Sequence, residues 1–135
     1  MKPILSAISG FCASLCLVLA GHAVFAQAYP QQYFRSPLDI PLNLSGNFGE
    51  LRTNHFHSGI DIKTEQREGL PVYAAAEGYI SRIKVSSVGY GYALYIDHPN
   101  GYTTVYGHLK NYHGAIAEFT RDQQYQIESF SIDVT

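Results

Sequence analysis

The stretch "ALYIDHPNGYTTVYGHL", from Ala93 to Leu109, decides the fold class of this chain. Two runs of β-branched and aromatic residues flank "HPNG", whose proline and Asn-Gly pair favour a tight turn. The pattern predicts a β-hairpin, and alternation sorts the side chains of its second strand between two faces. One face would hold Tyr102, Thr104, Tyr106 and His108. The other face would hold Thr103, Val105 and Leu109.

The segments on either side of this hairpin also predict mostly β-structure. Apolar residues alternate through "IPLNLSGNFGELR", and "LPVYAAAEGYISRIKVSS" predicts two short strands around a turn at Glu77–Gly78. Charges between Ile116, Phe119 and Tyr125 in "GAIAEFTRDQQYQ" indicate a short amphipathic helix, after which alternation returns in "ESFSIDVT". We therefore expect a mostly β domain built on an antiparallel sheet, with one short helix near the C-terminus.

The segment "HFHSGIDI", from His55 to Ile62, holds the candidate metal ligands. Kept extended, it would place His55, His57, Gly59 and Asp61 on one face. A neutral imidazole and a carboxylate are both good zinc ligands, and Gly59 lets the backbone turn so that His57 and Asp61 can meet one ion. Taken alone, the pair also fits a surface histidine near an aspartate in a turn, so both interpretations stay open.

Other polar residues of the hairpin have weaker claims to a site. His108 is either a partly exposed strand histidine or a general base within reach of an activated water molecule. For His98 and Asp97 we expect a turn residue and a hydrogen-bond acceptor at the end of a strand. Tyr95 and Tyr106 could line a substrate groove, but cross-strand packing is the commoner role of strand tyrosines.

Residues 1–26 have the features of a cleaved secretory signal peptide: Lys2 near the start, an apolar centre, and small residues up to Ala26. A membrane anchor is the alternative, but the apolar centre is shorter than the roughly 20 residues that a span needs. Cleavage would remove both cysteines, Cys12 and Cys16, and would exclude a cysteine nucleophile and a cysteine-bound metal. We expect an exported chain, in the periplasm, cell envelope or medium, with no stable membrane span.

Composition and charge exclude one class of partner. The formal net charge of −2, without a run of lysine or arginine, gives no electrostatic footprint for nucleic acid. Aromatic residues make up 13% of the chain and are all tyrosine or phenylalanine, which fits β-structure. Residues 27–38 contain two prolines and no apolar period, and we expect an extended lead-in over residues 27–43 before a domain over residues 44–135. The sequence indicates no oligomeric state.

Five segments occur in one order with compact spacing: "FGELR", "HSGID", "GLPVYAAAEGYI", "GYGYALYIDH" and "TTVYGHL". Together they resemble the lysostaphin-type (LytM-like) zinc metallopeptidases, which cut peptide bonds in bacterial peptidoglycan. The resemblance implies that His57 and Asp61 match the first two zinc ligands, and that His108 matches a histidine that assists catalysis beside the metal. It also implies zinc as the cofactor, a peptidoglycan peptide as the substrate, and an antiparallel β-fold with the site in a groove across one sheet.

The chain departs from this family after His108, where the family's later His-x-His motif is absent. One histidine of that motif completes the zinc site, so His57 and Asp61 alone would leave a weak, open site. His113 and His55 are the alternatives for a third ligand, although no motif match supports either. Truncation of the catalytic domain is the simpler explanation, and we expect it here.

Two functions stay open under this resemblance, beside a secreted β-domain without a metal. The first is an exported zinc metalloendopeptidase that hydrolyses peptidoglycan and is incomplete in this chain. The second is a non-catalytic module of the same fold, which binds peptidoglycan or regulates another cell-wall hydrolase. The presence of His57, Asp61 and His108 together favours the first, and the missing His-x-His motif favours the second.

Overall fold

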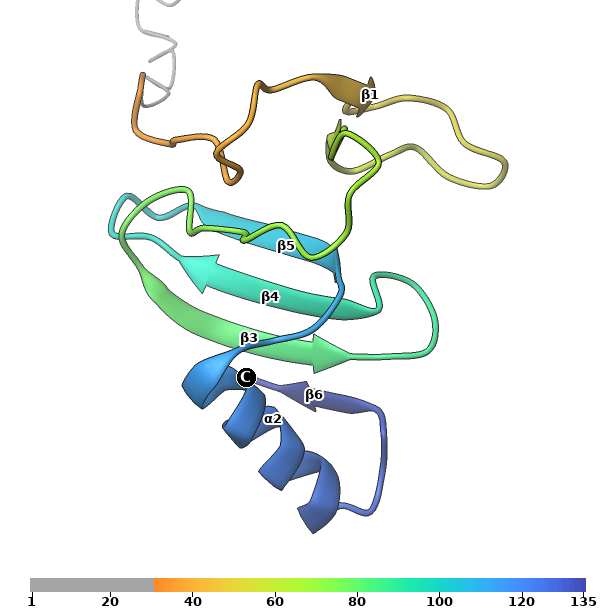
Figure 1. The fold of residues 1–135 in the computed structure, drawn as a ribbon, viewed down its shortest axis with the longest axis vertical. Helices are drawn as coiled ribbons and strands as arrows, with labels where there is room; N and C mark the ends of the chain where they lie inside the picture. Colours follow the sequence, from red (N-terminus) through yellow and green to blue (C-terminus); the bar gives the residue numbers. More distant parts are fainter. Residues whose placement is uncertain (1–30) are drawn as a thin grey trace, which may run out of the picture. The chain divides into compact units, whose positions relative to one another are not determined.

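A four-stranded antiparallel sheet lies at the centre of the computed structural model, which describes residues 31–135 (Figure 1). Its strands are β3 (Tyr79–Val85), β4 (Tyr92–Asp97), β5 (Thr103–Leu109) and β6 (Ile132–Val134), in the order β5-β4-β3-β6. A separate antiparallel pair consists of β1 (Leu44–Gly46) and β2 (Asp61–Ile62), and the helix of the described residues is α2 (Gly114–Gln126). The predicted fold class, mostly β with an antiparallel sheet and one short helix near the C-terminus, is confirmed.

The structure bears on only part of the predicted domain organisation. The signal peptide predicted for residues 1–26, with Cys12 and Cys16, lies outside the described residues, as do residues 27–30 of the lead-in. Residues Gln32–Thr135 form one unit. Within the described part of the chain, no helix is long and apolar enough to cross a membrane.

The β4–β5 hairpin forms where the sequence predicts it. Asp97 pairs with Thr103 next to the turn, and the His98 N–H donates to the Tyr102 carbonyl at 2.9 Å. Asp97 is a hydrogen-bond acceptor, as expected, because the hydroxyls of Thr103 (2.6 Å) and Ser81 (2.9 Å) both donate to its carboxylate. These hydrogen bonds, with that of Thr103 first, hold the pKa of the Asp97 carboxyl below its ordinary value.

A β-bulge near the end of β5 changes which side chains face the core. Between the pairs Leu94–Tyr106 and Tyr92–Leu109, β5 advances by three residues while β4 advances by two. The extra residue brings Leu109 to the side of Tyr106, and Leu109 packs against the buried cluster that contains Tyr106. The prediction that Leu109 shares a face with Val105 is therefore wrong, because strict alternation ends at the bulge.

Residues 70–76, predicted as the first of two short strands, form a loop instead. Their backbone hydrogen bonds go to the lead-in: the Tyr73 N–H donates to the Pro37 carbonyl at 2.9 Å, and the Arg35 N–H donates to the Ala75 carbonyl at 2.8 Å. The Arg35 guanidinium also lies 5.0 Å from the centre of the Tyr73 ring. The described part of the lead-in is therefore held against this loop.

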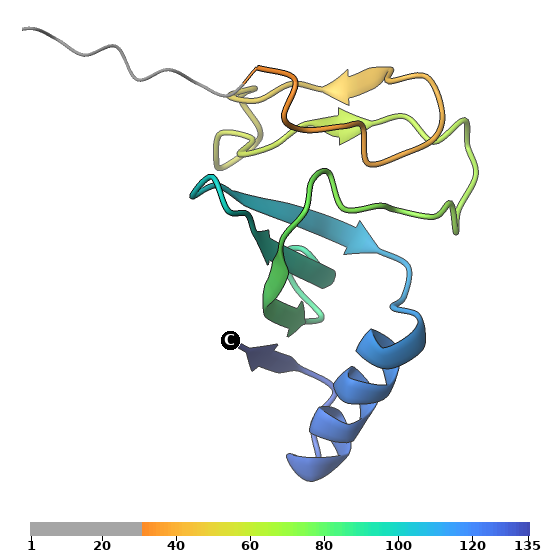
Figure 2. The same cartoon turned by 90° about the vertical axis from the view of Figure 1, so that its left-hand side faces the viewer.

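The helix α2 spans the segment that the sequence predicts to be helical. Ile116 and Ala117 pack against a buried cluster that includes residues of β3 and β6. Phe119 and Tyr125, which were expected on the same apolar stripe, are exposed. Figures 1 and 2 both show α2 beside β6, with β1 and β2 beyond the β5 edge of the sheet. The helix therefore contacts the core mainly through its first turns.

Two buried apolar clusters form the core of the described residues. The first contains Ile83, Val85, Tyr112 and Ile132, and the second contains Ala75, Ile96 and Tyr106. Leu94 and Leu109 pack against both clusters and so join them across β4 and β5. In the first cluster, burial raises the pKa of Tyr112 to about 12, and its hydroxyl donates to the Ala93 carbonyl at 2.7 Å.

Candidate metal centre

His57 and Asp61 lie side by side where the chain enters β2. Nε2 of His57 is 3.3 Å from Oδ1 of Asp61. Ligand atoms bound to one zinc ion at about 2.0–2.2 Å lie about 3.3–3.6 Å apart when the site is tetrahedral. The two side chains therefore have the separation of two corners of a zinc site, and an imidazole and a carboxylate are donors that suit this ion.

A narrow backbone loop positions His57. The Gly49 N–H donates to the His57 carbonyl at 2.7 Å, and the His57 N–H donates to the Glu50 carbonyl at 2.8 Å. Nearer the tip of the loop, Leu51 and Phe56 form an isolated antiparallel bridge. Backbone hydrogen bonds thus close the loop that carries His57. Within "HFHSGIDI", only Asp61 and Ile62 belong to a regular strand.

Arg52 holds the second oxygen of Asp61. Its Nη2 donates to Oδ2 of Asp61 at 2.6 Å, and this hydrogen bond keeps the pKa of the Asp61 carboxyl below its usual value. The charges of His57 and His108 lower that pKa further. A Cβ atom at Gly46 would overlap the Asp61 carboxylate and the Arg52 guanidinium, so a side chain at this position would displace the ends of both.

The hydrogen bonds of His57 leave Nε2 for a metal ion. Nδ1 lies 3.1 Å from the Asn47 carbonyl and 3.3 Å from Nη2 of Arg52. A carbonyl only accepts and a guanidinium only donates, so Nδ1 cannot bond to both. We infer that Nδ1 of His57 carries the ring proton and donates it to the Asn47 carbonyl, because Nη2 of Arg52 already makes its shorter bond to Asp61. When one ring nitrogen of a histidine ligand donates a hydrogen bond to a backbone carbonyl, this bond fixes the tautomer and leaves the other nitrogen free to bind a metal.

His108 lies in the bulge of β5. Its φ of 54° is left-handed, which few residues other than glycine adopt. Its backbone N–H donates to the Tyr90 carbonyl at 2.8 Å, and its ring packs edge to face against the Tyr90 ring. His108 is exposed, and its charge is one of the smaller contributions that lower the pKa of Asp61. Tyr90 in turn lies 2.9 Å through its hydroxyl from Oγ of Ser58, so His108 is connected through one residue to the segment that carries the pair.

Neither His55 nor His113 joins the pair. Among residues 31–135, no three histidine, cysteine, aspartate or glutamate side chains are grouped so as to hold a metal ion. Nδ1 of His55 lies 2.7 Å from the side-chain oxygen of Asn54, and His113 is the N-cap residue that precedes α2. The described residues therefore fit zinc with two donors and offer no third.

His98 is a buried residue of the fold and lies outside the pair. Only 5% of it is exposed, its Nδ1 lies 2.7 Å from the Glu77 carbonyl, and its Nε2 lies 2.8 Å from the Thr104 hydroxyl. The same hydroxyl bonds to that of Tyr106 at 2.9 Å.

Tyr95 and Tyr106 have packing roles in the sheet. Tyr106 belongs to a buried cluster, and the guanidinium carbon of Arg82 in β3 lies 5.1 Å from the centre of the Tyr95 ring. Both tyrosines thus have the packing roles that were expected of them.

Arg52, Asn47 and Tyr90 are the site residues that the sequence reasoning missed. Arg52 stands in "FGELR", one of the five quoted segments, but nothing in that segment indicates its bond to Asp61. Tyr90 stands in the glycine-rich connection "VGYGY" and in "GYGYALYIDH", another of the five segments, but neither indicates its contacts with Ser58 and His108. Asn47 acts through its backbone carbonyl, so its side chain type carries no signal.

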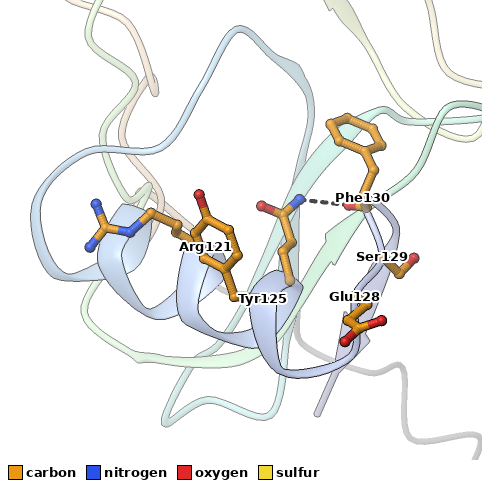
Figure 3. Close-up of a pocket in the computed structure, with 6 residues that line it drawn as sticks. Arg121, Tyr125, Glu128, Ser129 and Phe130 are labelled. Atoms are coloured by element: carbon orange, nitrogen blue, oxygen red, sulfur yellow. Dashed lines mark hydrogen bonds between the residues drawn. The ribbon is translucent and has the colours of Figure 1, made fainter.

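A separate hollow of about 440 Å³ lies at the end of α2 (Figure 3). It is lined by Arg121, Gln124, Tyr125, Glu128, Ser129 and Phe130. The Gln124 amide donates to the Phe130 carbonyl across it at 2.6 Å. It shares no residue with the His57–Asp61 pair and contains no histidine, so we assign no chemistry to it.

Comparison with known proteins identifies the family. The profile of Peptidase family M23 matches residues 55–123, just over half of the chain, and this range includes His57, Asp61 and His108. This chain belongs to Peptidase family M23. Members of family M23 are metallopeptidases that generally depend on zinc, so the predicted LytM-like membership is confirmed.

Two curated relatives of the M23 chain are proteins named DD-carboxypeptidase/endopeptidase Mpg, from Neisseria meningitidis serogroup B and Neisseria gonorrhoeae. Each is 46% identical over 59 residues, which are 44% of this chain and 13% of the relative. The match therefore spans a small part of these relatives' length. No solved structure matches the M23 chain.

Proposed function

We propose that this M23 chain carries part of an exported zinc metalloendopeptidase that hydrolyses peptide bonds of bacterial peptidoglycan. The observation that carries the proposal is the 3.3 Å separation of Nε2 of His57 and Oδ1 of Asp61 in a chain of a metallopeptidase family. The relatives named DD-carboxypeptidase/endopeptidase support hydrolysis of peptide bonds as the reaction class.

His57 and Asp61 would hold the metal through Nε2 and Oδ1. Zinc, when bound, supplies a Lewis acid that activates water and polarises a scissile carbonyl. His108 would accept a proton from the attacking water and donate one to the leaving amine, and its exposure gives water and a peptide access to its ring. The Asn47 carbonyl and the Arg52 guanidinium would keep the two donors oriented.

A second function is favoured by the absence of a third donor beside the pair within residues 31–135. Two ligands hold zinc weakly, because structural and catalytic zinc sites in proteins use at least three. The second candidate is accordingly a non-catalytic module that binds peptidoglycan or regulates another cell-wall hydrolase. It differs from the first in predicting binding to peptidoglycan without cleavage.

A zinc titration of the purified chain tests the metal site. We expect zinc to bind at one site, weakly enough to be removed by dialysis against a chelator, and His57→Ala to abolish that binding. His55→Ala is the matched control, because this exposed histidine lies two residues away and should leave zinc binding unchanged. Equal zinc binding by His57→Ala and the unmodified chain would refute the proposed donor pair.

Incubation with purified peptidoglycan separates the two functions. Release of peptide fragments by the zinc-loaded chain, detected by mass spectrometry and lost in His108→Ala, would support the peptidase. Sedimentation with peptidoglycan without fragment release would support the binding module.

A further inference from the structure

Tyr90 connects the segment that carries the His57–Asp61 pair with the bulge that carries His108. It lies in the connection between β3 and β4, and its hydroxyl is 2.9 Å from Oγ of Ser58, the residue that follows His57. Its carbonyl accepts a hydrogen bond from the His108 N–H at 2.8 Å. Its ring meets the His108 imidazole edge to face, with the ring centres 6.0 Å apart. One residue therefore contacts both halves of the candidate site.

The bulge is built to let this tyrosine approach closely. A Cβ atom at Gly107 would lie 3.1 Å from Cδ1 and 3.3 Å from Cγ of Tyr90, closer than side-chain carbons ordinarily pack. Only a glycine before His108 leaves the ring in this position without displacing it. The left-handed backbone of His108 also persists only where its surroundings hold it, and the Tyr90 carbonyl is one such partner.

Packing alone does not account for Tyr90. It is 45% exposed and belongs to neither buried cluster, in contrast to Tyr112, whose hydroxyl bonds to two backbone carbonyls within the core. Ser58 contacts the hydroxyl of Tyr90, and His108 contacts its carbonyl and the edge of its ring. Because both partners belong to the candidate site or lie next to it, these contacts indicate a role for Tyr90 in the geometry of the site.

We propose that Tyr90 is a positioning residue that sets the placement of the His108 imidazole relative to the His57–Asp61 pair, with Ser58 as its anchor. This inference rests on the proposed function for its catalytic meaning. Tyr90 need not touch the substrate, because it acts through the loop on one side and through His108 on the other. A misplaced base costs rate, since proton transfer requires hydrogen-bond reach.

Nuclear magnetic resonance of the His108 ring tests this coupling without any catalytic assay. Ser58→Ala and Tyr90→Phe each remove one hydroxyl of the same hydrogen bond and keep the Tyr90 ring. We expect both variants to shift the ¹H–¹³C signals of the His108 ring in the same direction, and the double variant to shift them no further than either single variant. The signals of buried His98 report whether the fold is retained.

Two control variants make the result specific. Tyr79→Phe removes a tyrosine hydroxyl that bonds to Asp97, and Ser129→Ala removes a hydroxyl that bonds to the Ser131 backbone, so both should leave the His108 signals in place. Unchanged His108 signals in Ser58→Ala and Tyr90→Phe would overturn the inference. Additive shifts in the double variant would overturn it as well, because the two hydroxyls would then act independently.

Kinetics distinguishes this inference from the proposed function. If the zinc-loaded chain cleaves peptidoglycan, Tyr90→Phe should lower kcat by about tenfold to a hundredfold while KM changes by less than about twofold. A rise in KM at unchanged kcat would instead indicate a contact with the substrate and would contradict a positioning role. Absence of cleavage by the unmodified chain would count against the peptidase, while the His108 signals would still decide whether Tyr90 couples the two segments.

Discussion

At the scale of single residues, the two oxygen atoms of Asp61 have different partners. Oδ2 accepts a hydrogen bond from Arg52 at 2.6 Å, and Oδ1 faces Nε2 of His57 at 3.3 Å. The guanidinium therefore fixes the carboxylate with one oxygen directed at the place where the metal is proposed to bind. It also keeps the carboxyl ionised, because its hydrogen bond lowers the pKa of Asp61.

Arg52→Ala should therefore weaken zinc binding by about tenfold to a hundredfold, the usual cost of losing a partner that orients a metal ligand. The measurement is a calorimetric zinc titration of the variant and the unmodified chain. Arg67→Ala is the matched control, because Arg67 pairs with Glu65 in a loop and contacts neither proposed ligand. Equal zinc affinity of Arg52→Ala and the unmodified chain would show that Asp61 needs no such support.

His98 contributes to stability through buried hydrogen bonds. His98→Ala would leave the Glu77 carbonyl and the Thr104 hydroxyl without their imidazole partner, so we expect a loss of about 2–4 kcal/mol in the free energy of unfolding. Urea denaturation followed by circular dichroism measures it. His113→Ala should change that free energy by less than about 0.5 kcal/mol, because the exposed His113 side chain makes no capping hydrogen bond. Similar losses in both variants would contradict the prediction.

At the scale of elements, an ion pair fastens β6 to β3. Nε and Nη2 of Arg82 both donate to the Asp133 carboxylate at 2.6 Å, and Nζ of Lys84 lies 3.2 Å away. The Arg82 hydrogen bonds, followed by that of Lys84, lower the pKa of Asp133 to about 2. The side chains of Arg82 and Asp133 are 35% and 40% exposed, so solvent and salt reduce the strength of the pair.

The direction of the Asp133 pKa shift decides how the contribution of this ion pair to stability depends on pH. A folded pKa below the unfolded value of about 3.9 stabilises the fold above that pH, and the contribution is lost as the pH falls toward about 2. Asp133→Asn should therefore flatten the decline in unfolding free energy between about pH 4 and about pH 2. Urea denaturation at several pH values measures this slope.

Asp122→Asn is the control for that experiment, because its contact with Arg121 is longer, at 3.8 Å, and more exposed. It should leave the acid slope nearly unchanged. The same slope in Asp133→Asn and the unmodified chain would mean that β6 does not depend on the ion pair.

At the scale of the whole molecule, Leu94 and Leu109 join the two apolar clusters across β4 and β5. Leu109→Ala removes contacts from both clusters at once, so residues Gln32–Thr135 should still unfold in one transition but with a free energy lower by about 1.5–3 kcal/mol. Thermal unfolding followed by circular dichroism measures the change. Leu42→Ala, at a half-exposed leucine, should stay within about 0.5 kcal/mol of the unmodified chain. Two separate transitions in Leu109→Ala would show that the clusters unfold independently.

The local patterns account for much of the fold. Turn chemistry at "HPNG" predicted the hairpin, and helical spacing predicted α2 with its bounds. The apolar residues of segment 70–76 predict a strand, but the segment forms a loop because its hydrogen-bond partners lie in the lead-in, far away in the sequence. Leu109 was assigned to the wrong face because one extra residue in β5 shifts the alternation, and no residue type announces a bulge.

The sequence by itself determined the family, the antiparallel sheet with one helix, and the three residues proposed for the site. Hydrophobic period, turn residues and motif order are local properties, and local properties can be read along a chain. Only the tertiary structure decided that Arg52 shares Asp61 with His57, that Tyr90 spans from Ser58 to His108, and that no third donor from residues 31–135 joins the pair. These contacts depend on distances between segments separated in the sequence, and such distances arise only when the strands pair and the loops between them close.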